Sequence, residues 1–256
     1  MKQTMNIQIA NFCQEIEPSV TMKITALANE LRQKGEDIIS LSAGELQEDT
    51  PKNIKQAAIN AINDGKTRYT PASGINELKQ AICNKFKTNN QCDYSPENII
   101  VSCGAKHSIF NALAAILNPH DEVLIPTPYW VSYPDQVRLL GAIPIFLKTT
   151  ETTQFKITPE LIKENLSNKT KILILNSPSN PTGMIYQQKE LEEIASICLQ
   201  NEILILSDEI YADLIYDNQQ HISIASLSEE VKKQTILING VSKSYAMTGW
   251  RIGYLA

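Results

Sequence analysis

Residues 171–208 read KILILNSPSNPTGMIYQQKELEEIASICLQNEILILSD, and this stretch decides the fold class. Two continuous apolar runs, Lys171–Asn176 and Ile203–Ser207, enclose a segment of helical periodicity, Gln187–Gln200. Continuous apolar runs are typical of parallel strands that are buried on both faces, and two parallel strands need a crossover that is usually a helix. The stretch therefore predicts a β-α-β unit within an α/β protein.

The same alternation of apolar runs and helical patterns occupies the chain from residue 98 onward. We therefore predict a mostly parallel sheet with helices on both faces. Further strands are expected at Asn98–Ser102, Glu122–Pro126, Ile143–Leu147 and Thr235–Asn239, and further helices at Lys106–Leu117 and Val131–Leu140. An apolar segment at Trp250–Ala256 is expected to form one more strand, exposed at an edge with nothing covering it.

The first 97 residues show helical spacing instead. One helix is expected to end before Gly35, a natural C-terminal cap. A second is expected to begin at Thr50-Pro51, with Thr50 as N-cap and Pro51 in the first turn. A third, Ile75–Lys87, is expected to bury Ile75, Leu78, Ile82 and Phe86.

Composition excludes several classes of protein. The chain has 256 residues, a formal net charge of −5, 43% hydrophobic residues and 20% charged residues, as a globular protein does. The acidic balance argues against nucleic-acid binding, which needs clustered positive charge. No apolar stretch approaches the roughly 18 residues of a membrane span, and Glu15 and Glu17 interrupt the apolar run that a signal peptide needs. We therefore expect a cytoplasmic protein that binds neither nucleic acid nor membrane.

The five cysteines and three histidines carry no metal or nucleophile signature. The cysteines are scattered, without a C-x-x-C pair or a histidine at metal-ligand spacing, and G-x-S-x-G is absent. We therefore expect no metal site and no disulfide framework, and we expect each cysteine to be a buried or half-buried side chain. The cysteines are Cys13, Cys83, Cys92, Cys103 and Cys198.

Polar residues follow several of the predicted strands, where open α/β sheets bind their ligands. Residues 103–106, CGAK, open a helix whose free N–H groups can bind an anion. Residues 177–183, SPSNPTG, form a rigid turn, and Asp208 and Tyr211 follow the next strand. After the strand that ends at Asn239, Lys243 lies between two serines. A partly buried lysine can form a Schiff base, and pyridoxal phosphate also needs a carboxylate, a donor to its phenolic oxygen and an anion cradle.

These segments resemble the class I aminotransferases, the aspartate aminotransferase family of fold type I. Residues 242–254, SKSYAMTGWRIGY, are similar to the cofactor-lysine motif of that family. Four further matches occur in order along the chain, at residues 66–71, 129–134, 180–183 and 207–211. The resemblance implies the large domain of that fold over residues 46–256, preceded by an N-terminal arm and helix over residues 1–45. It also implies a homodimer, and a small C-terminal domain that the chain lacks.

The resemblance also assigns roles to residues of the cofactor site. Lys243 would form the Schiff base with pyridoxal phosphate and shuttle the substrate proton, and Asp208 would keep the pyridine nitrogen protonated. Tyr211 and Asn180 would bond the phenolic oxygen. The phosphate and ring would be held by Gly104, Ala105, Lys106, Trp130, Ser242 and Arg251, and by Tyr69 acting on the neighbouring subunit. Gly44, Trp130 and Asn180 would contact the substrate, and Lys106 would assist with its distal carboxylate.

The activity that the resemblance implies is transfer of an amino group from an aspartate-like amino acid to 2-oxoglutarate. Two departures from the family pattern stand out: residues 44–48, GELQE, lack the family's proline and aromatic residue, and the arginine that binds the α-carboxylate has no counterpart. The alternatives are a truncated, inactive remnant, a lyase or decarboxylase of the same fold, and a generic α/β binding module.

Overall fold

The computed structural model describes residues 8–14, 16, 20–42 and 44–256, so Glu15 and Glu17 lie outside the described residues. The chain divides into two compact units, Met1–Glu45 and Leu46–Ala256. In the described part of the first unit, α1 (Asn11–Gln14) precedes α2 (Val20–Gln33). Helix α2 ends just before Gly35, which has a φ of +90° as predicted for a glycine cap.

The larger unit is built around a seven-stranded sheet in the order β1-β7-β6-β5-β4-β2-β3. The strands are β1 (Ile100–Ser102), β2 (Glu122–Thr127), β3 (Ile143–Lys148), β4 (Thr170–Asn176), β5 (Leu204–Asp208), β6 (Thr235–Gly240) and β7 (Gly253–Leu255). Strands β3, β2, β4, β5 and β6 pair in parallel, and β7 is antiparallel to both β6 and β1. The predicted mostly parallel α/β sheet is confirmed.

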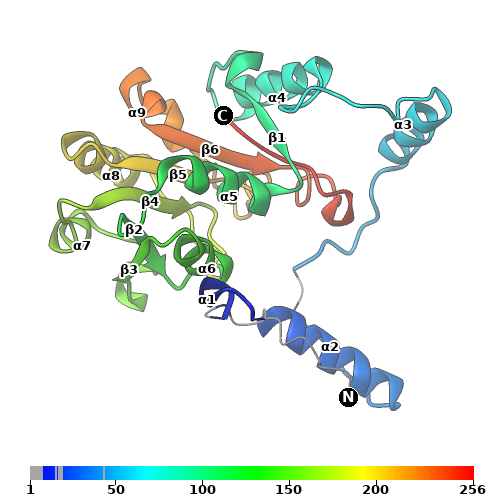
Figure 1. Ribbon diagram of the computed structural model, residues 1–256, viewed down its shortest axis with the longest axis horizontal. Coiled ribbons are helices and arrows are strands. Elements are labelled where there is room, and N and C mark those ends of the chain that lie inside the picture. Colours follow the sequence, from blue (N-terminus) through cyan, green and yellow to red (C-terminus); the bar gives the residue numbers. More distant parts are fainter. Residues whose placement is uncertain (1–7, 15, 17–19, 43) are drawn as a thin grey trace, which may run out of the picture. The chain divides into compact units, whose positions relative to one another are not determined.

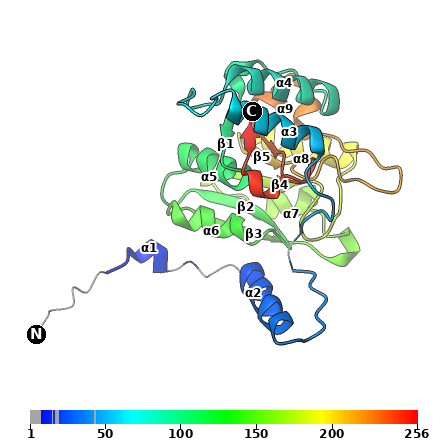
Figure 2. The same ribbon diagram turned by 90° about the vertical axis from the view of Figure 1, so that its right-hand side faces the viewer.

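Helices cover both faces of this sheet. The helices of this unit are α3 (Lys52–Asn63), which buries no residue, α4 (Asn76–Asn89), α5 (Ala105–Ile116), α6 (Ser132–Leu139), α7 (Pro159–Glu164), α8 (Gln188–Gln200) and α9 (Glu229–Lys233), with short 3-10 turns η1 (Pro96–Asn98), η2 (Glu151–Thr153), η3 (Ile224–Ser226) and η4 (Thr248–Trp250). Figure 1 labels these elements, and Figure 2 shows α5 and α6 on one side of the strands and α7 and α8 on the other. None of the helices in the described ranges is both long and apolar enough to cross a bilayer.

The core explains why the strands read as continuous apolar runs. Within β4, Ile172 and Ile174 pack with α5 and α6, whereas Leu173 and Leu175 pack with α8. Successive side chains of a strand point to opposite faces, so a strand covered on both faces has no polar alternate positions. The β-α-β unit predicted from residues 171–208 follows from this burial.

The last strand corrects the prediction of an uncovered edge at Trp250–Ala256. Strand β7 lies inside the sheet between β1 and β6, and Tyr254 is only 2% exposed. The backbone of Gly253 also lies against the start of α5, where a Cβ atom would be 2.1 Å from the nitrogen of Ala105. Antiparallel insertion between two strands therefore buries the segment that the sequence suggested was an exposed edge.

Three local predictions are also wrong. Thr50 does not cap α3, because its hydroxyl donates to the carbonyl of Ala246 at 2.5 Å instead. Ile75 is 42% exposed, since it precedes α4 rather than lying on its buried face. Cys13 and Cys103 are exposed, whereas the other three cysteines are buried as expected.

Candidate functional site

Asp208 is the last residue of β5 and is only 3% exposed. The hydroxyl of Tyr133 donates to its Oδ2 at 2.6 Å, and the backbone N–H of Ile210 donates to its Oδ1 at 3.2 Å. Burial raises the pKa of Asp208 to about 6, and the two hydrogen bonds oppose that shift because they favour the ionised form. Asp208 is therefore a buried carboxylate with an oriented set of donors.

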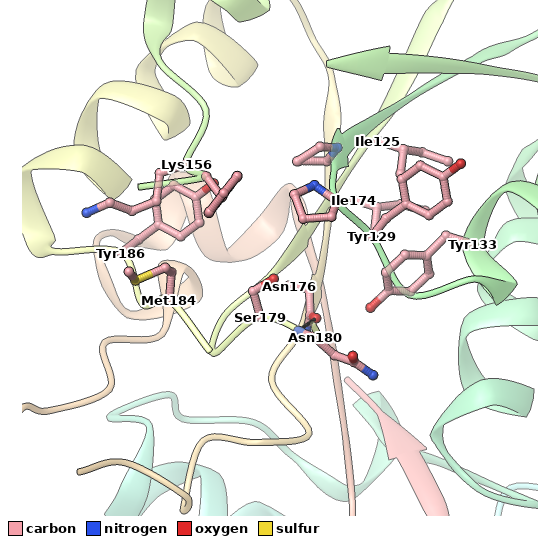
Figure 3. Close-up of a pocket in the computed structure, with 13 residues that line it drawn as sticks. Ile125, Tyr129, Tyr133, Lys156, Ile174, Asn176, Ser179, Asn180, Met184 and Tyr186 are labelled. Atoms are coloured by element: carbon pink, nitrogen blue, oxygen red, sulfur yellow. Dashed lines mark hydrogen bonds between the residues drawn. The ribbon is translucent and has the colours of Figure 1, made fainter. Parts of the chain in front are cut away.

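The proline-rich turn after β4 is fixed to this carboxylate strand by Asn176. The Asn176 amide donates to the carbonyl of Asp208 at 2.9 Å, and its Oδ1 accepts from the N–H of Asn180 at 2.8 Å. Figure 3 shows that the Asn180 and Tyr133 side chains lie on the side of the pocket away from Lys156 and Tyr186. Asn176 therefore links the backbone of Asn180 to the backbone of Asp208 through two hydrogen bonds.

Tyr211 and Lys243 come from the loops after two neighbouring strands, β5 and β6. The Nζ atom of Lys243 lies 5.6 Å from the centroid of the Tyr211 ring. Burial raises the pKa of Tyr211, the charge of Asp208 adds to this rise, and a hydrogen bond with Asn180 opposes it. The predicted residues Asn180, Asp208, Tyr211 and Lys243 thus lie at one place on the carboxyl edge of the sheet.

The start of α5 forms a second part of the site. Gly104 has a φ of +92°, and a Cβ atom there would lie 2.4 Å from Nη2 of Arg251, so the guanidinium packs directly against the glycine. Arg251 is held by the carbonyls of Thr248 and Cys103, at 2.8 and 3.4 Å. A helix start with an adjacent guanidinium favours an anion.

Lys106 and Trp130 connect the helix start to the buried carboxylate. The Nζ atom of Lys106 lies 4.9 Å from the Trp130 ring centroid, and Trp130 contacts Tyr133 edge to face at 5.3 Å. Burial lowers the pKa of Lys106, and the positive charge of Arg251 lowers it further. A chain of contacts therefore runs from Lys106 through Trp130 and Tyr133 to Asp208.

Three other residues predicted for the site differ in how exposed they are and in which compact unit they belong to. Ser242 is 9% exposed and directly precedes Lys243. Tyr69 lies in the larger unit with a fully exposed side chain. Gly44 belongs to the other compact unit, Met1–Glu45, where it is exposed.

Three parts of the site were not predicted from the sequence: Tyr133, Asn176 and a buried group around Glu209. Oε2 of Glu209 contacts Nε2 of His221 at 2.7 Å and accepts from Asn90 at 2.7 Å, while its Oε1 accepts from Ser207 at 3.0 Å and Ser223 at 2.8 Å. A polar residue at a position predicted to be buried could have indicated this group, since buried polar side chains need hydrogen-bond partners. The sequence does not identify those partners, because they lie far away along the chain.

A small cavity adjoins the site between the ends of β2 and β4 (Figure 3). Its volume of about 20 Å³ is room for a single water molecule. Tyr133, Asn176 and Asn180 line one side of it, and Phe155 and Tyr186 contribute to its wall. This cavity is too small for a cofactor, and Asp208, Tyr211 and Lys243 are not among the residues that line it. Among the described residues, no three His, Cys, Asp or Glu side chains are placed to hold a metal ion.

Comparisons of the sequence with known proteins identify a family. The sequence profile of "Aminotransferase class I and II" matches residues 36–256. An aspartate aminotransferase of Bacillus sp. (strain YM-2) is 54% identical over 248 residues, which are 97% of this chain and 63% of that protein. An aspartate aminotransferase of Bacillus subtilis is 49% identical over 250 residues, 98% of this chain and 64% of that protein.

The fold agrees with solved structures as well. The aspartate aminotransferase of Thermus thermophilus with maleate superposes with a TM-score of 0.94 at 40% identity, covering 98% of this chain and 65% of that one. The chain thus spans somewhat less than two thirds of the length of these relatives. From the matched profile and these similarities, the chain belongs to the aminotransferase class I and II family.

Proposed function

We propose that the chain contributes the cofactor site of a pyridoxal-phosphate-dependent aminotransferase, which moves the amino group of an aspartate-like amino acid to 2-oxoglutarate. The observation that carries the proposal is the meeting of the Lys243 amine, the buried Asp208 carboxylate and the Tyr211–Asn180 pair. The names of the relatives support the choice of donor, since several are aspartate aminotransferases.

The donor set fits pyridoxal phosphate, which the family implies in general. Its phosphate is a dianion, which suits the start of α5 and the Arg251 guanidinium. The close approach of Arg251 to Gly104 leaves no room for a Cβ atom there, as a tight anion cradle requires. Asp208 suits a protonated ring nitrogen, and Lys243 suits an aldehyde.

The chemistry of the bound group follows from its structure: pyridoxal phosphate supplies an aldehyde that takes up an amino group and a ring that accepts electrons. Lys243 would bind the aldehyde carbon through Nζ and, when the substrate displaces it, move the proton at the substrate's α-carbon. Asp208 would hold a proton at the ring nitrogen. Tyr211 and Asn180 would donate to the phenolic oxygen.

Other residues would hold and orient the cofactor and substrate. Trp130 would lie against the ring face, and Lys106, above Trp130, would assist with the distal carboxylate of the substrate. Ser242 and Ala105 would add donors to the phosphate. In a homodimer, the exposed Tyr69 would bind the cofactor phosphate of the neighbouring subunit. Gly44 would contact the α-carboxylate of the substrate.

The first test is cofactor capture. The purified chain is incubated with pyridoxal phosphate and reduced with borohydride, and the labelled lysine is mapped by mass spectrometry. We expect near-stoichiometric label on Lys243, none on this peptide in Lys243→Ala, and full label in the matched control Lys189→Ala, whose side chain is 87% exposed. Scattered label, or none, would contradict the proposed site.

The second test follows the reaction. With aspartate and 2-oxoglutarate, a second sample of the protein, loaded with pyridoxal phosphate but not reduced, should form oxaloacetate and glutamate in equal amounts. Release of ammonia or of a β-fragment would indicate a lyase instead. Label on Lys243 without any turnover would show that this chain binds the cofactor but does not transfer an amino group by itself.

A further inference from the structure

Lys85, on α4, lies where the loops after β5 and β6 meet. Its Nζ atom donates to Oδ2 of Asp213 at 2.7 Å and to Oγ of Ser244 at 3.5 Å, and it lies 5.1 Å from the ring centroid of Tyr245. The Lys85 side chain is only 12% exposed. One cation therefore touches both loops, on residues that the proposed reaction does not use.

The two loops are the ones that carry Tyr211 and Lys243. Asp213 is two residues from Tyr211 in the sequence, and Ser244 directly follows Lys243. Asp213 accepts a second hydrogen bond from Asn89 of α4, at 3.4 Å. Burial alone would raise the pKa of Asp213, but hydrogen bonds from Lys85 and Ser244 hold it below its usual range. The carboxylate is thus ionised and held from two sides.

Helix α4 is a firm base for this contact. Ile82, Cys83 and Phe86 are buried in the core, with Phe86 0% exposed, and they flank Lys85 in the sequence. A side chain that projects from a packed helix is held more precisely than one on a loop. Lys85 can therefore fix the two loops to a packed helix.

We propose that Lys85 is a positioning residue, which with Asp213 and Ser244 fixes the loop after β5 against the loop after β6 and so sets the spacing between Tyr211 and Lys243. The effect of Lys85 on catalysis rests on the proposed function. The joining of the two loops by Lys85 does not depend on any cofactor.

Hydrogen–deuterium exchange of the protein alone tests the structural part. The amides of Leu214 and Tyr245 bond to the carbonyls of Tyr211 and Val241, at 2.8 and 3.2 Å, and report on the two loops. In Lys85→Met we expect both amides to exchange roughly tenfold faster, because the loops open locally. The control is Lys87→Met on the same helix, whose ion pair with Asp93 is 3.4 Å long and largely exposed. Unchanged exchange in Lys85→Met would overturn the proposal.

The rate of Lys243 labelling by pyridoxal phosphate and borohydride tests the functional part. We expect Lys85→Met and Asp213→Asn to slow labelling roughly tenfold, because misplaced reacting groups lose rate steeply. Lys85→Arg keeps a charge-assisted hydrogen bond to Asp213 and should recover the wild-type rate to within about threefold. Melting temperatures close to that of Lys87→Met would separate positioning from folding.

The outcomes distinguish the two proposals. Wild-type labelling rates in Lys85→Met, or no recovery in Lys85→Arg, would overturn the positioning role. If the wild-type chain takes no label on Lys243, the proposed function fails, and the exchange measurement still decides whether Lys85 joins the loops.

Discussion

The phenol oxygen of Tyr133 donates a 2.6 Å hydrogen bond to Oδ2 of Asp208, so that the first turn of α6 reaches the end of β5. Both residues are almost fully buried, at 2% and 3% exposed. Burial raises the pKa of Asp208 to about 6, and the Tyr133 bond limits that rise. Tyr133 therefore helps to keep this buried carboxylate ionised near neutral pH.

Tyr133→Phe should raise the pKa of Asp208 further, by about one to two units, because a hydrogen bond to a charged group contributes roughly 1.5–3 kcal/mol. A carbon-13 NMR titration of the Asp208 carboxyl measures this directly. Tyr129→Phe is the matched control, since Tyr129 stacks on Phe146 instead. An unchanged titration in Tyr133→Phe would mean that the hydrogen bond has no effect on the protonation of Asp208.

Asp208 should also make folding depend on pH. Its pKa rises from an ordinary 3.8 to about 6 on folding, so its contribution to stability is fully present below about pH 4 and is lost as the pH rises through about 6. Asp208→Asn removes the buried charge and should therefore be more stable than wild type at pH 7.5, by about 1–3 kcal/mol. Urea unfolding at pH 5 and pH 7.5 tests this. An equal difference at both pH values would contradict it.

Two glycines should respond differently to alanine. A Cβ atom at Gly253 meets backbone, the nitrogen of Ala105 at 2.1 Å, whereas one at Gly104 meets the flexible end of Arg251 at 2.4 Å. Gly253→Ala should cost about 3 kcal/mol or more, and Gly104→Ala about 1–2 kcal/mol from its positive φ. Thermal unfolding compares their stabilities.

Gly104→Ala should have its main effect on anion binding. The added methyl displaces the Arg251 guanidinium from the start of α5, so we expect the affinity for pyridoxal phosphate to fall about tenfold or more. Titration calorimetry measures that affinity. An unaltered affinity would show that Arg251 does not act at this helix start.

Glu209→Gln should lower the pKa of His221. Burial by itself lowers that pKa, but the charge and hydrogen bond of Glu209 raise it above 6.5 overall. A raised histidine pKa stabilises the fold below about pH 6.5, and this contribution is lost as the pH rises through the folded-state pKa. The variant should therefore lose about 3 kcal/mol at pH 6 and less at pH 9.

Proton NMR of the histidines tests this prediction. The His221 signal should titrate at lower pH in Glu209→Gln, and the signals of His107 and His120 serve as internal controls. A His221 titration that stays in place would show that Glu209 does not control its protonation.

Much of the fold could be predicted because burial of an element leaves a pattern of apolar residues within that element's own sequence. Strand β4 runs from Thr170 to Asn176 and was predicted one residue shorter, since two buried faces leave a continuous apolar run. Strand order has no such local signal. The segment that forms β7 was expected at an edge, because nothing in residues 250–256 records that two strands flank it.

The site was predictable to the extent that its residues follow strands. Asp208 ends strand β5, and Asn180, Tyr211 and Lys243 come from loops at the same edge of the sheet, as the α/β pattern predicts; their roles remain predictions. Tyr133 was missed because its partner Asp208 is 75 residues away in the sequence. Thr50 was wrongly predicted as a helix N-cap for the same reason, since its hydroxyl donates to a carbonyl 196 residues away in the sequence.

The insertion of β7 has a consequence for biosynthesis. Among the described strands, β1 pairs with β7 alone, so it joins the sheet only after a segment about 150 residues later has been made. At typical translation rates of roughly 5–20 residues per second, that interval lasts about 8–30 s. Throughout it the nascent chain holds β1 without its partner and exposes the apolar side of α5 that later packs on β7.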